Sequence, residues 1–148
     1  MKATFLFLIL VFTLSCSKQE NSSIVYPQTI IPVQIIKGHL NYNNTYGNQN
    51  IVIQNTTDWQ TLMDNFSTIG VINNIAFSET NIDFQNFMII FVTEVNNGTT
   101  TIDITTIEEN LNNLFVTVQN LQVGVTTDVA HPFHIVKIPI TTKPIIFQ

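Results

Sequence analysis

The hydrophobic pattern of the chain centres on residues 87–107, which predict a strand, a tight turn and a second strand. Residues 87–92 form an unbroken apolar run rich in β-branched and aromatic side chains, which is typical of a strand buried on both faces. Asn97 and Gly98 follow, and this pair favours a two-residue hairpin turn because both residues adopt positive φ readily. Residues 99–105 would then return as the second strand of a central hairpin.

The position of this turn predicts the register of the hairpin. Counting outwards from the turn places Ile104 opposite Phe91, with their side chains on the same face. Ile107 has the wrong parity to join Ile104 on the buried face, because side chains alternate along a strand. We therefore expect a bulge near residues 105–106 that restores Ile107 to the core side.

One main helix is predicted, over residues 57–67. Thr57 and Gln60 have the spacing of a capping box, and Asp58 lies where a carboxylate favours the positive end of the helix dipole. Apolar residues then recur with the helical period at Trp59, Leu62, Met63 and Phe66. We expect this apolar stripe to pack against the mixed face of the central hairpin.

Short apolar runs between Asn-, Gly- and Pro-containing loops predict the remaining strands. These runs are residues 33–36, 51–53, 114–118, 132–139 and 145–147. The expected fold class is α+β. Its core would be a mostly antiparallel sheet of six or seven strands, curled into a sandwich or partial barrel, with the helix packed against it.

The amino-terminal residues resemble a bacterial lipoprotein signal. Lys2 is followed by an apolar stretch over residues 3–14, and then by Ser15 and Cys16. This stretch is shorter than the roughly 20 apolar residues that span a bilayer. In such signals the cysteine is lipidated and becomes the first residue of the mature protein, so we expect residues 1–15 to be a signal peptide and Cys16 to be the lipidation site.

Cys16 is also the only cysteine, which excludes an intramolecular disulfide. We expect residues 16–32 to form a flexible tether, since residues 17–23 are polar and lack apolar periodicity. Residues 33–148 would form a single domain. The expected location follows from the signal: export through the inner membrane and lipid anchoring in the cell envelope, with the outer membrane as the expected site.

The charge composition argues against a nucleic-acid partner. The chain contains five lysines and no arginine, and its formal net charge is −5 at pH 7. A protein that binds nucleic acid neutralises phosphates with a basic surface. No such surface can be assembled from this composition, so the expected partners are a membrane and another protein.

Candidate metal ligands are sparse. His131 and His134 are the one nearby pair, and residues three apart in a strand face opposite sides, so they cannot easily chelate one ion. We expect no metal and no cofactor. His134 shares parity with the apolar residues that follow it, which predicts a histidine at the edge of the core, bonded to backbone.

Candidate catalytic groups are equally sparse. Asp83 precedes the central strand and is expected to bond to nearby backbone amides. Glu108 and Glu109 are expected to form a solvated pair in a polar connection. No motif pairs a Ser or Thr nucleophile with a histidine base. The sequence therefore predicts that the protein is not an enzyme.

Several of these segments together resemble the carboxy-terminal domain of the PrcB family, named for a lipoprotein subunit of a bacterial surface protease complex. The segments are Asp58-Trp59, Asp83-Phe84, Gly98 and residues 132–139. The resemblance covers about residues 51–147 and is most specific in the last segment. It implies a secreted or lipid-anchored accessory module, and not a protease. The family has a paired glycine and an aromatic residue at the central turn, where this chain has a single glycine and three threonines.

The leading functional hypothesis is a lipid-anchored accessory or binding protein of the cell envelope. Its partner would be another envelope protein, a protease being one candidate. The residues of the central turn are the candidate contact, namely Asn96, Asn97, Gly98, Thr99 and Thr100.

Two alternatives stay open. The first is a protease inhibitor-like module that presents the turn at residues 96–101 and the loop at residues 122–128 to an active site. The second is a small-ligand or glycan binder that uses Trp59 or Tyr46. Trp59 lies on the apolar stripe of the helix, however, and such a tryptophan is expected to be a packing residue.

Overall fold

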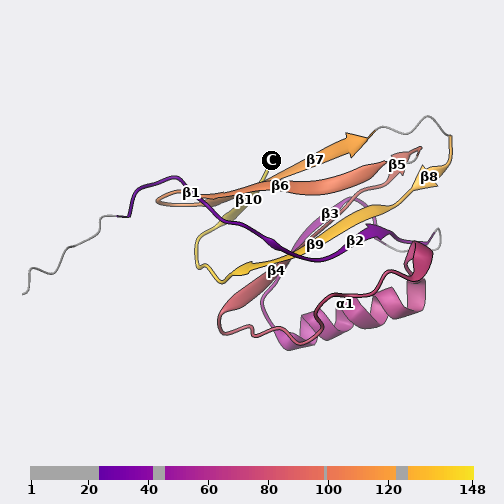
Figure 1. Cartoon of the computed structure of the whole chain (residues 1–148), viewed down its shortest axis with the longest axis horizontal. Coiled ribbons are helices and arrows are strands. Elements are labelled where there is room, and N and C mark those ends of the chain that lie inside the picture. Colours follow the sequence, from indigo (N-terminus) through magenta and orange to yellow (C-terminus); the bar gives the residue numbers. More distant parts are fainter. Residues whose placement is uncertain (1–23, 42–45, 99, 123–126) are drawn as a thin grey trace, which may run out of the picture.

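The computed structural model describes residues 24–41, 46–98, 100–122 and 127–148. Three layers make up the domain: one helix, α1 (Thr56–Ile69), packs on a four-stranded sheet, and the other face of that sheet packs on a second four-stranded sheet (Figure 1). The predicted α+β class, with mostly antiparallel strands and one main helix, is confirmed. The sheets form a sandwich.

The middle layer is antiparallel throughout. Its order is β2 (Val33–His39), β9 (Pro132–Pro139), β4 (Phe87–Thr93) and β3 (Gln49–Ile53). The outer sheet contains one parallel pair, β7 with β10. Its order is β1 (Gln28–Thr29), β6 (Thr101–Glu109), β7 (Leu114–Gln122) and β10 (Ile145–Phe147). A separate two-stranded ladder joins β5 (Asn96–Asn97) to β8 (Val129–Ala130).

The apolar run of β4 is explained by this layering. Ile89 and Phe91 belong to the core between the sheet and α1, whereas Ile90 and Val92 belong to the core between the two sheets. Alternate residues of a strand point to opposite faces, so a strand in the middle layer must be apolar at every position. The predicted central strand, buried on both faces, is confirmed.

The predicted central hairpin is wrong. β4 pairs with β3 and β9, and Phe91 lies opposite Ile51 and Ile135 instead of Ile104. After Thr93 the chain leaves the middle sheet and crosses to the outer sheet, where β6 pairs with β7. Both edges of β4 are thus occupied by strands distant in sequence, which leaves no free edge for β6.

The predicted bulge in the second strand is confirmed. The register between β6 and β7 shifts between Ile104 and Thr106. Ile104 and Ile107 consequently both face the inter-sheet core, with 5 % and 0 % of their surface exposed. One extra residue is what changes the parity of a strand, so the hydrophobic pattern alone located the irregularity.

Helix α1 begins one residue before the prediction and ends two residues after it. Its N-cap is Asn55, whose side-chain oxygen accepts a hydrogen bond from the backbone N–H of Asp58 at 2.9 Å. The predicted cap, Thr57, is already inside the helix. Asn is at least as favourable as Thr at the N-cap position. Because Asn55 caps the helix, α1 starts at Thr56 and not at the predicted residue 57.

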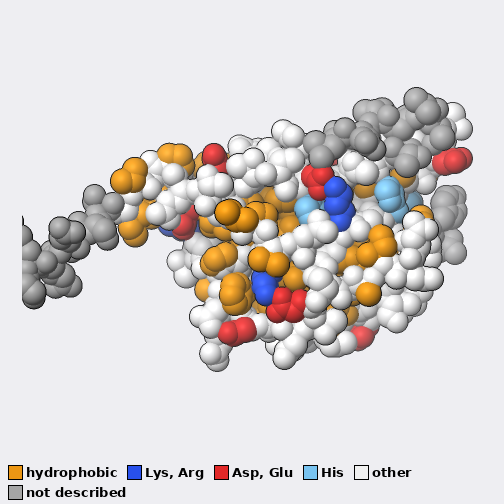
Figure 2. Space-filling view, viewed as in Figure 1, with side chains coloured by type: hydrophobic (Ala, Val, Ile, Leu, Met, Phe, Trp, Pro, Cys, Tyr) orange, Lys and Arg blue, Asp and Glu red, His pale blue; other side chains and the backbone are white. Residues whose placement is uncertain are grey.

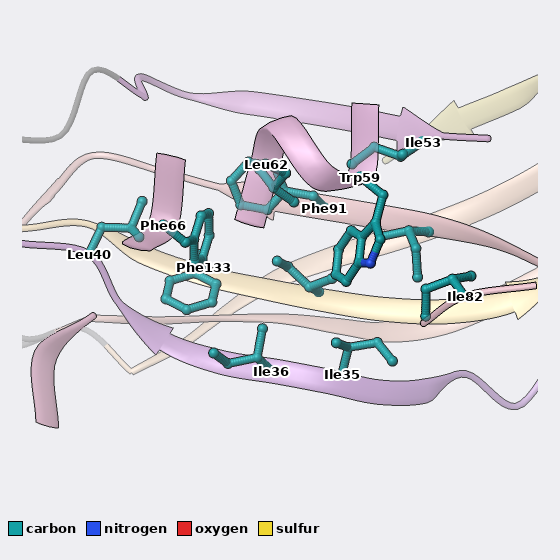
Figure 3. Close-up of a cluster of buried hydrophobic side chains, with 12 residues drawn as sticks. Ile35, Ile36, Leu40, Ile53, Trp59, Leu62, Phe66, Ile82, Phe91 and Phe133 are labelled. Carbon is teal, nitrogen blue, oxygen red and sulfur yellow. The ribbon is translucent and has the colours of Figure 1, made fainter. Parts of the chain in front are cut away.

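The predicted apolar stripe on α1 is buried, but it packs on the middle sheet and not on a hairpin (Figure 3). Trp59, Leu62 and Phe66 are buried, and Met63 packs against the same cluster. Phe66 meets Phe133 of β9 edge-on with ring centroids 4.9 Å apart. The helix therefore covers the face of β9 and β4, and not the face of a hairpin.

Part of the predicted tether belongs to the domain. Gln28 and Thr29 form β1 and pair with Glu109 and Glu108 of β6. The backbone N–H of Ile30 then donates to Ile107 at 2.8 Å. The domain therefore begins before Val33, because the polar backbone of this short segment completes one edge of the outer sheet.

Candidate functional site

A pocket of about 420 Å³ opens at one end of the sandwich. It forms where the end of β2, the start of β9, the β5–β8 ladder and the short 3-10 helix η1 (Ile72–Asn74) meet. A volume of this size is within the range of small-ligand sites. Its lining is His39, Leu40, Ile72, Asn73, Gly98, Asp128, Val129, Ala130 and His131, and we refer to it as the histidine pocket.

His39 is fixed in this pocket by the crossover between the sheets. Its Nε2 lies 2.7 Å from the backbone oxygen of Thr100. A carbonyl oxygen only accepts, so Nε2 carries the proton and donates. The imidazole thereby ties the end of β2 to the start of β6.

His131 lines the same pocket, next to the point where His39 of β2 pairs with Pro132 of β9. The backbone N–H of Leu40 donates to the carbonyl oxygen of His131 at 2.9 Å. The Nδ1 atom of His131 is buried without a hydrogen-bond partner in the described part of the chain. A buried polar atom without a hydrogen-bond partner costs free energy.

A larger hollow of about 650 Å³ runs along α1. Asp64 is the one titratable side chain among the described residues that line it. The histidine pocket instead combines His39, His131 and Asp128 with apolar side chains, which is the mixture expected of a binding site. We therefore take the smaller pocket as the candidate site.

The predicted partner-contact turn lies at this same end of the molecule but is not a hairpin turn. Asn96 and Asn97 pair with Ala130 and Val129, and the N–H of Gly98 donates to the carbonyl of Asp128. Asn97 is exposed and Asn96 is half-buried, whereas Gly98 and Thr100 are buried. Thr99 lies outside the described residues, as does the predicted lipidation site, Cys16.

His134 is where the sequence predicted it, at the core edge and bonded to backbone. Its Nδ1 accepts the N–H of Ile104 at 3.0 Å, and 5 % of the residue is exposed. Asp103 Oδ1 lies 3.2 Å from the same nitrogen. Burial lowers the pKa of His134, which outweighs the opposing effect of Asp103 and is reinforced by Lys37. The neutral imidazole is thus the folded form.

The carboxylates singled out in the sequence have structural partners. Asp83 accepts from the backbone N–H of Gln85 at 3.0 Å and from the side chain of Asn86 at 2.7 Å, and these bonds lower its pKa. This is the predicted bonding at the start of a strand. Glu108 and Glu109 lie in β6 and not in a connection, and Glu109 pairs with Lys143 at 3.0 Å.

Trp59 and Tyr46 are packing residues in this structure. Trp59 is 1 % exposed, and its Nε1 donates to the carbonyl of Thr80 at 2.7 Å. Tyr46 packs edge-on against Phe91 with centroids 5.4 Å apart. A stacking platform for a glycan needs an accessible ring face. The prediction that Trp59 packs in the core is confirmed.

The described residues contain no group of three or more His, Cys, Asp or Glu side chains placed to hold a metal ion. No helix among residues 24–41, 46–98, 100–122 and 127–148 has the length and apolar character to cross a membrane.

Three parts of the pocket were not predicted from the sequence: His39, η1 and β8. His39 follows the apolar part of β2, and Val129 and Ala130 form a strand of only two residues. Neither carries a periodic signal. The glycine at position 98 was the one local indication that the chain turns sharply here.

Comparisons of the chain with protein-family models, with curated proteins and with solved structures found no match. The resemblance to the PrcB family therefore rests on the sequence segments described above and stays a prediction.

Proposed function

We propose that this protein is a binding protein of the cell envelope, without catalytic activity, anchored by a lipid on Cys16. The proposal starts from the lipoprotein-like signal before Cys16. Several acyl chains on one cysteine give stable anchoring, since each buried methylene contributes about 0.8 kcal/mol. We expect export through the inner membrane and anchoring in the outer membrane.

The observation that carries the proposal is where the histidine pocket lies relative to the start of the domain. The first described residues and β1 lie at one end of the sandwich, and β5 and β8 lie at the opposite end (Figure 1). The residues that line the pocket include Val129 and Ala130 of β8, at that opposite end. A lipid anchor ahead of residue 24 would leave the pocket facing away from the bilayer, where a partner can approach.

The rim of the pocket suits a protein partner. Ile72 and Val129 line it and are each 45 % exposed. Apolar side chains that remain exposed around a concave site are typical of contact surfaces. An apolar side chain of the partner would fill the pocket, with Asn97 of the predicted contact turn beside it. A protease is one candidate partner, through the PrcB resemblance.

The test is capture of a partner from detergent-solubilised envelopes with the full-length, lipidated protein. We expect one stoichiometric partner, and we expect Ile72→Asp combined with Val129→Asp to reduce its capture at least tenfold. Ile146→Asp is the matched control, because Ile146 is 39 % exposed on β10, outside the pocket. Unchanged capture by the double variant, or no stoichiometric partner, would overturn the proposal.

The anchor has its own test. The mass of the mature amino-terminal peptide should show a lipidated Cys16, and Cys16→Ser should be released from membranes. A Cys16→Ser protein that is processed normally and stays equally membrane-bound would contradict the anchor.

A protease inhibitor-like module is the second candidate, and one observation favours it. The β5–β8 ladder pairs the first two residues of the predicted turn at 96–101 with the two residues that follow the predicted loop at 122–128. The two predicted contact segments therefore start or end at the same end of the domain. Assays against a panel of proteases decide between the candidates, since an inhibitor blocks turnover at stoichiometric concentration and an accessory protein leaves turnover unchanged or raises it.

A further inference from the structure

We infer that the end of the domain nearest the amino terminus is a surface that contacts the lipid bilayer. The surface consists of Ile24, Val25, Leu111 and Ile140, and we call it the anchor-end surface. The inference rests on the proposed lipid anchor at Cys16 and adds to it a defined orientation of the domain on the membrane.

Large apolar side chains are strongly exposed on the anchor-end surface. Val25 is 75 % exposed, Leu111 70 %, Ile24 63 % and Ile140 44 %. Figure 2 shows apolar side chains gathered at the end where the described chain begins, away from the histidines. Single exposed apolar residues are ordinary, but a cluster of them indicates an interaction surface.

Lys143 holds three segments together as one surface. Its Nζ lies 4.4 Å from the ring centroid of Tyr26 and 3.1 Å from the hydroxyl of the same residue. The same Nζ donates to the backbone oxygen of Asn110 at 2.6 Å and pairs with Glu109 at 3.0 Å. The segment at residues 24–26, the β6–β7 turn and the loop after β9 are thereby fixed relative to one another.

A hollow of about 470 Å³ connects the apolar residues of two of these segments. Ile24 and Ile140 both line it, together with Tyr26 and Lys143. Leu111 follows Asn110, whose backbone is bonded to the same lysine. Ile24 and Ile140 thus share one hollow with Lys143, while Leu111 and Val25 are the chain neighbours of residues that this lysine contacts or that line the hollow.

The position of the proposed anchor selects the bilayer as the occupant. Ile24 is eight residues after Cys16, and eight residues of extended chain span at most about 29 Å. A domain of this size has a diameter similar to that span. A tether no longer than the domain is wide favours an orientation in which the anchor-end surface faces the membrane.

The charged side chains at this end do not supply an attraction to an anionic membrane. Lys143 and Glu109 pair with each other. Glu108 is exposed nearby on β6, and it would oppose an anionic membrane surface. Apolar insertion at the boundary between headgroups and acyl chains would therefore provide the attraction.

A fluorescent probe on the full-length, lipidated protein tests the inference. Cys16 is the only cysteine in the chain, and its thiol is consumed by lipidation, so Leu111→Cys offers a single reactive thiol. Ile72→Cys, at the pocket end, is the matched control. Each is labelled with the nitrobenzoxadiazole fluorophore and reconstituted in vesicles of phosphatidylethanolamine and phosphatidylglycerol that contain nitroxide-labelled lipid.

We expect nitroxide quenching at position 111 to be at least threefold stronger than at position 72. Substituting Ser at Ile24 and Ile140 should reduce this difference while the protein stays on the vesicles. Equal quenching at the two positions would overturn the inference and leave the anchor intact. A probe at position 111 that is shielded from water but not quenched by lipid would also overturn it, since a protein or a second copy then covers the surface.

Failure of the proposed function gives a different result. If Cys16 is not lipidated, the protein does not float with the vesicles and the labelling reagent reacts at two thiols. That outcome overturns the anchor and the orientation together.

Discussion

The Nδ1 atom of His134 on β9 accepts the backbone N–H of Ile104 on β6 at 3.0 Å, so one imidazole joins the two sheets of the sandwich. Asp103, the residue before Ile104, pairs with Lys37, which lies opposite His134 on β2. The cluster connects three strands at the end of the inter-sheet core. Protonation of His134 should therefore change the stability of the domain.

Stability should fall when His134 is protonated. Burial places the pKa of the folded imidazole below its ordinary value of 6.5, with Asp103 acting in the opposite sense. The unfolded chain then binds the proton more readily, so the stabilisation is complete above about pH 6.5 and is lost as the pH falls towards the folded pKa. One such proton gives a slope of at most about 1.4 kcal/mol per pH unit.

Urea unfolding between pH 7.5 and pH 5 measures this slope. His134→Gln should flatten it, whereas His131→Gln, which leaves His134 intact, should not. An equal slope in His134→Gln and the unsubstituted protein would show that another group is responsible.

Asn55→Ala should destabilise the domain by about 1 kcal/mol, because the side chain caps helix α1 at the N–H of Asp58. Thr57→Ala should change the free energy of unfolding by less than about 0.5 kcal/mol, since Thr57 is exposed inside the first turn. Urea denaturation of the two variants compares them directly. A larger loss in Thr57→Ala would support the cap that the sequence pattern suggested.

Gly70→Ala should destabilise the domain by roughly 1–3 kcal/mol. Gly70 ends α1 with φ 82° and ψ 147°, a conformation that L side chains rarely adopt, and an added Cβ would meet the Asn41 side chain. Gly47→Ala is the control, because nothing lies within 4 Å of a Cβ there. Equal thermal unfolding midpoints for the two variants would contradict this explanation.

Native Trp59 fluorescence should resist quenching by acrylamide, since the residue is 1 % exposed. Trp59→Ala should cost about 3–5 kcal/mol of stability, the range for removing a large core side chain. Leu111→Ala, at an exposed position, should stay within about 0.5 kcal/mol. Efficient quenching in the native protein would instead favour a ligand-stacking role for Trp59.

The histidine pocket was accessible to sequence reasoning only in part. The turn at Asn97 and Gly98 was recognised, and Gly98 does have a positive φ of 85°. The same local conformation occurs in a hairpin and in a crossover between two sheets. The turn residues therefore could not show which strand pairs with β4. His39 and Val129 come together with this turn only through pairings between distant strands.

The sequence by itself determined the main helix, the longer apolar strands and the buried face of each, because those properties follow from the period of apolar residues along the local backbone. Phe87–Thr93, the Trp59 stripe and the bulge before Ile107 are of this kind. Only the tertiary structure decided the neighbours of β4, the parallel placement of β10 and the site of the pocket. The backbone of an apolar strand can form hydrogen bonds with many other strands. Which strands become its neighbours therefore depends on the packing of the whole chain.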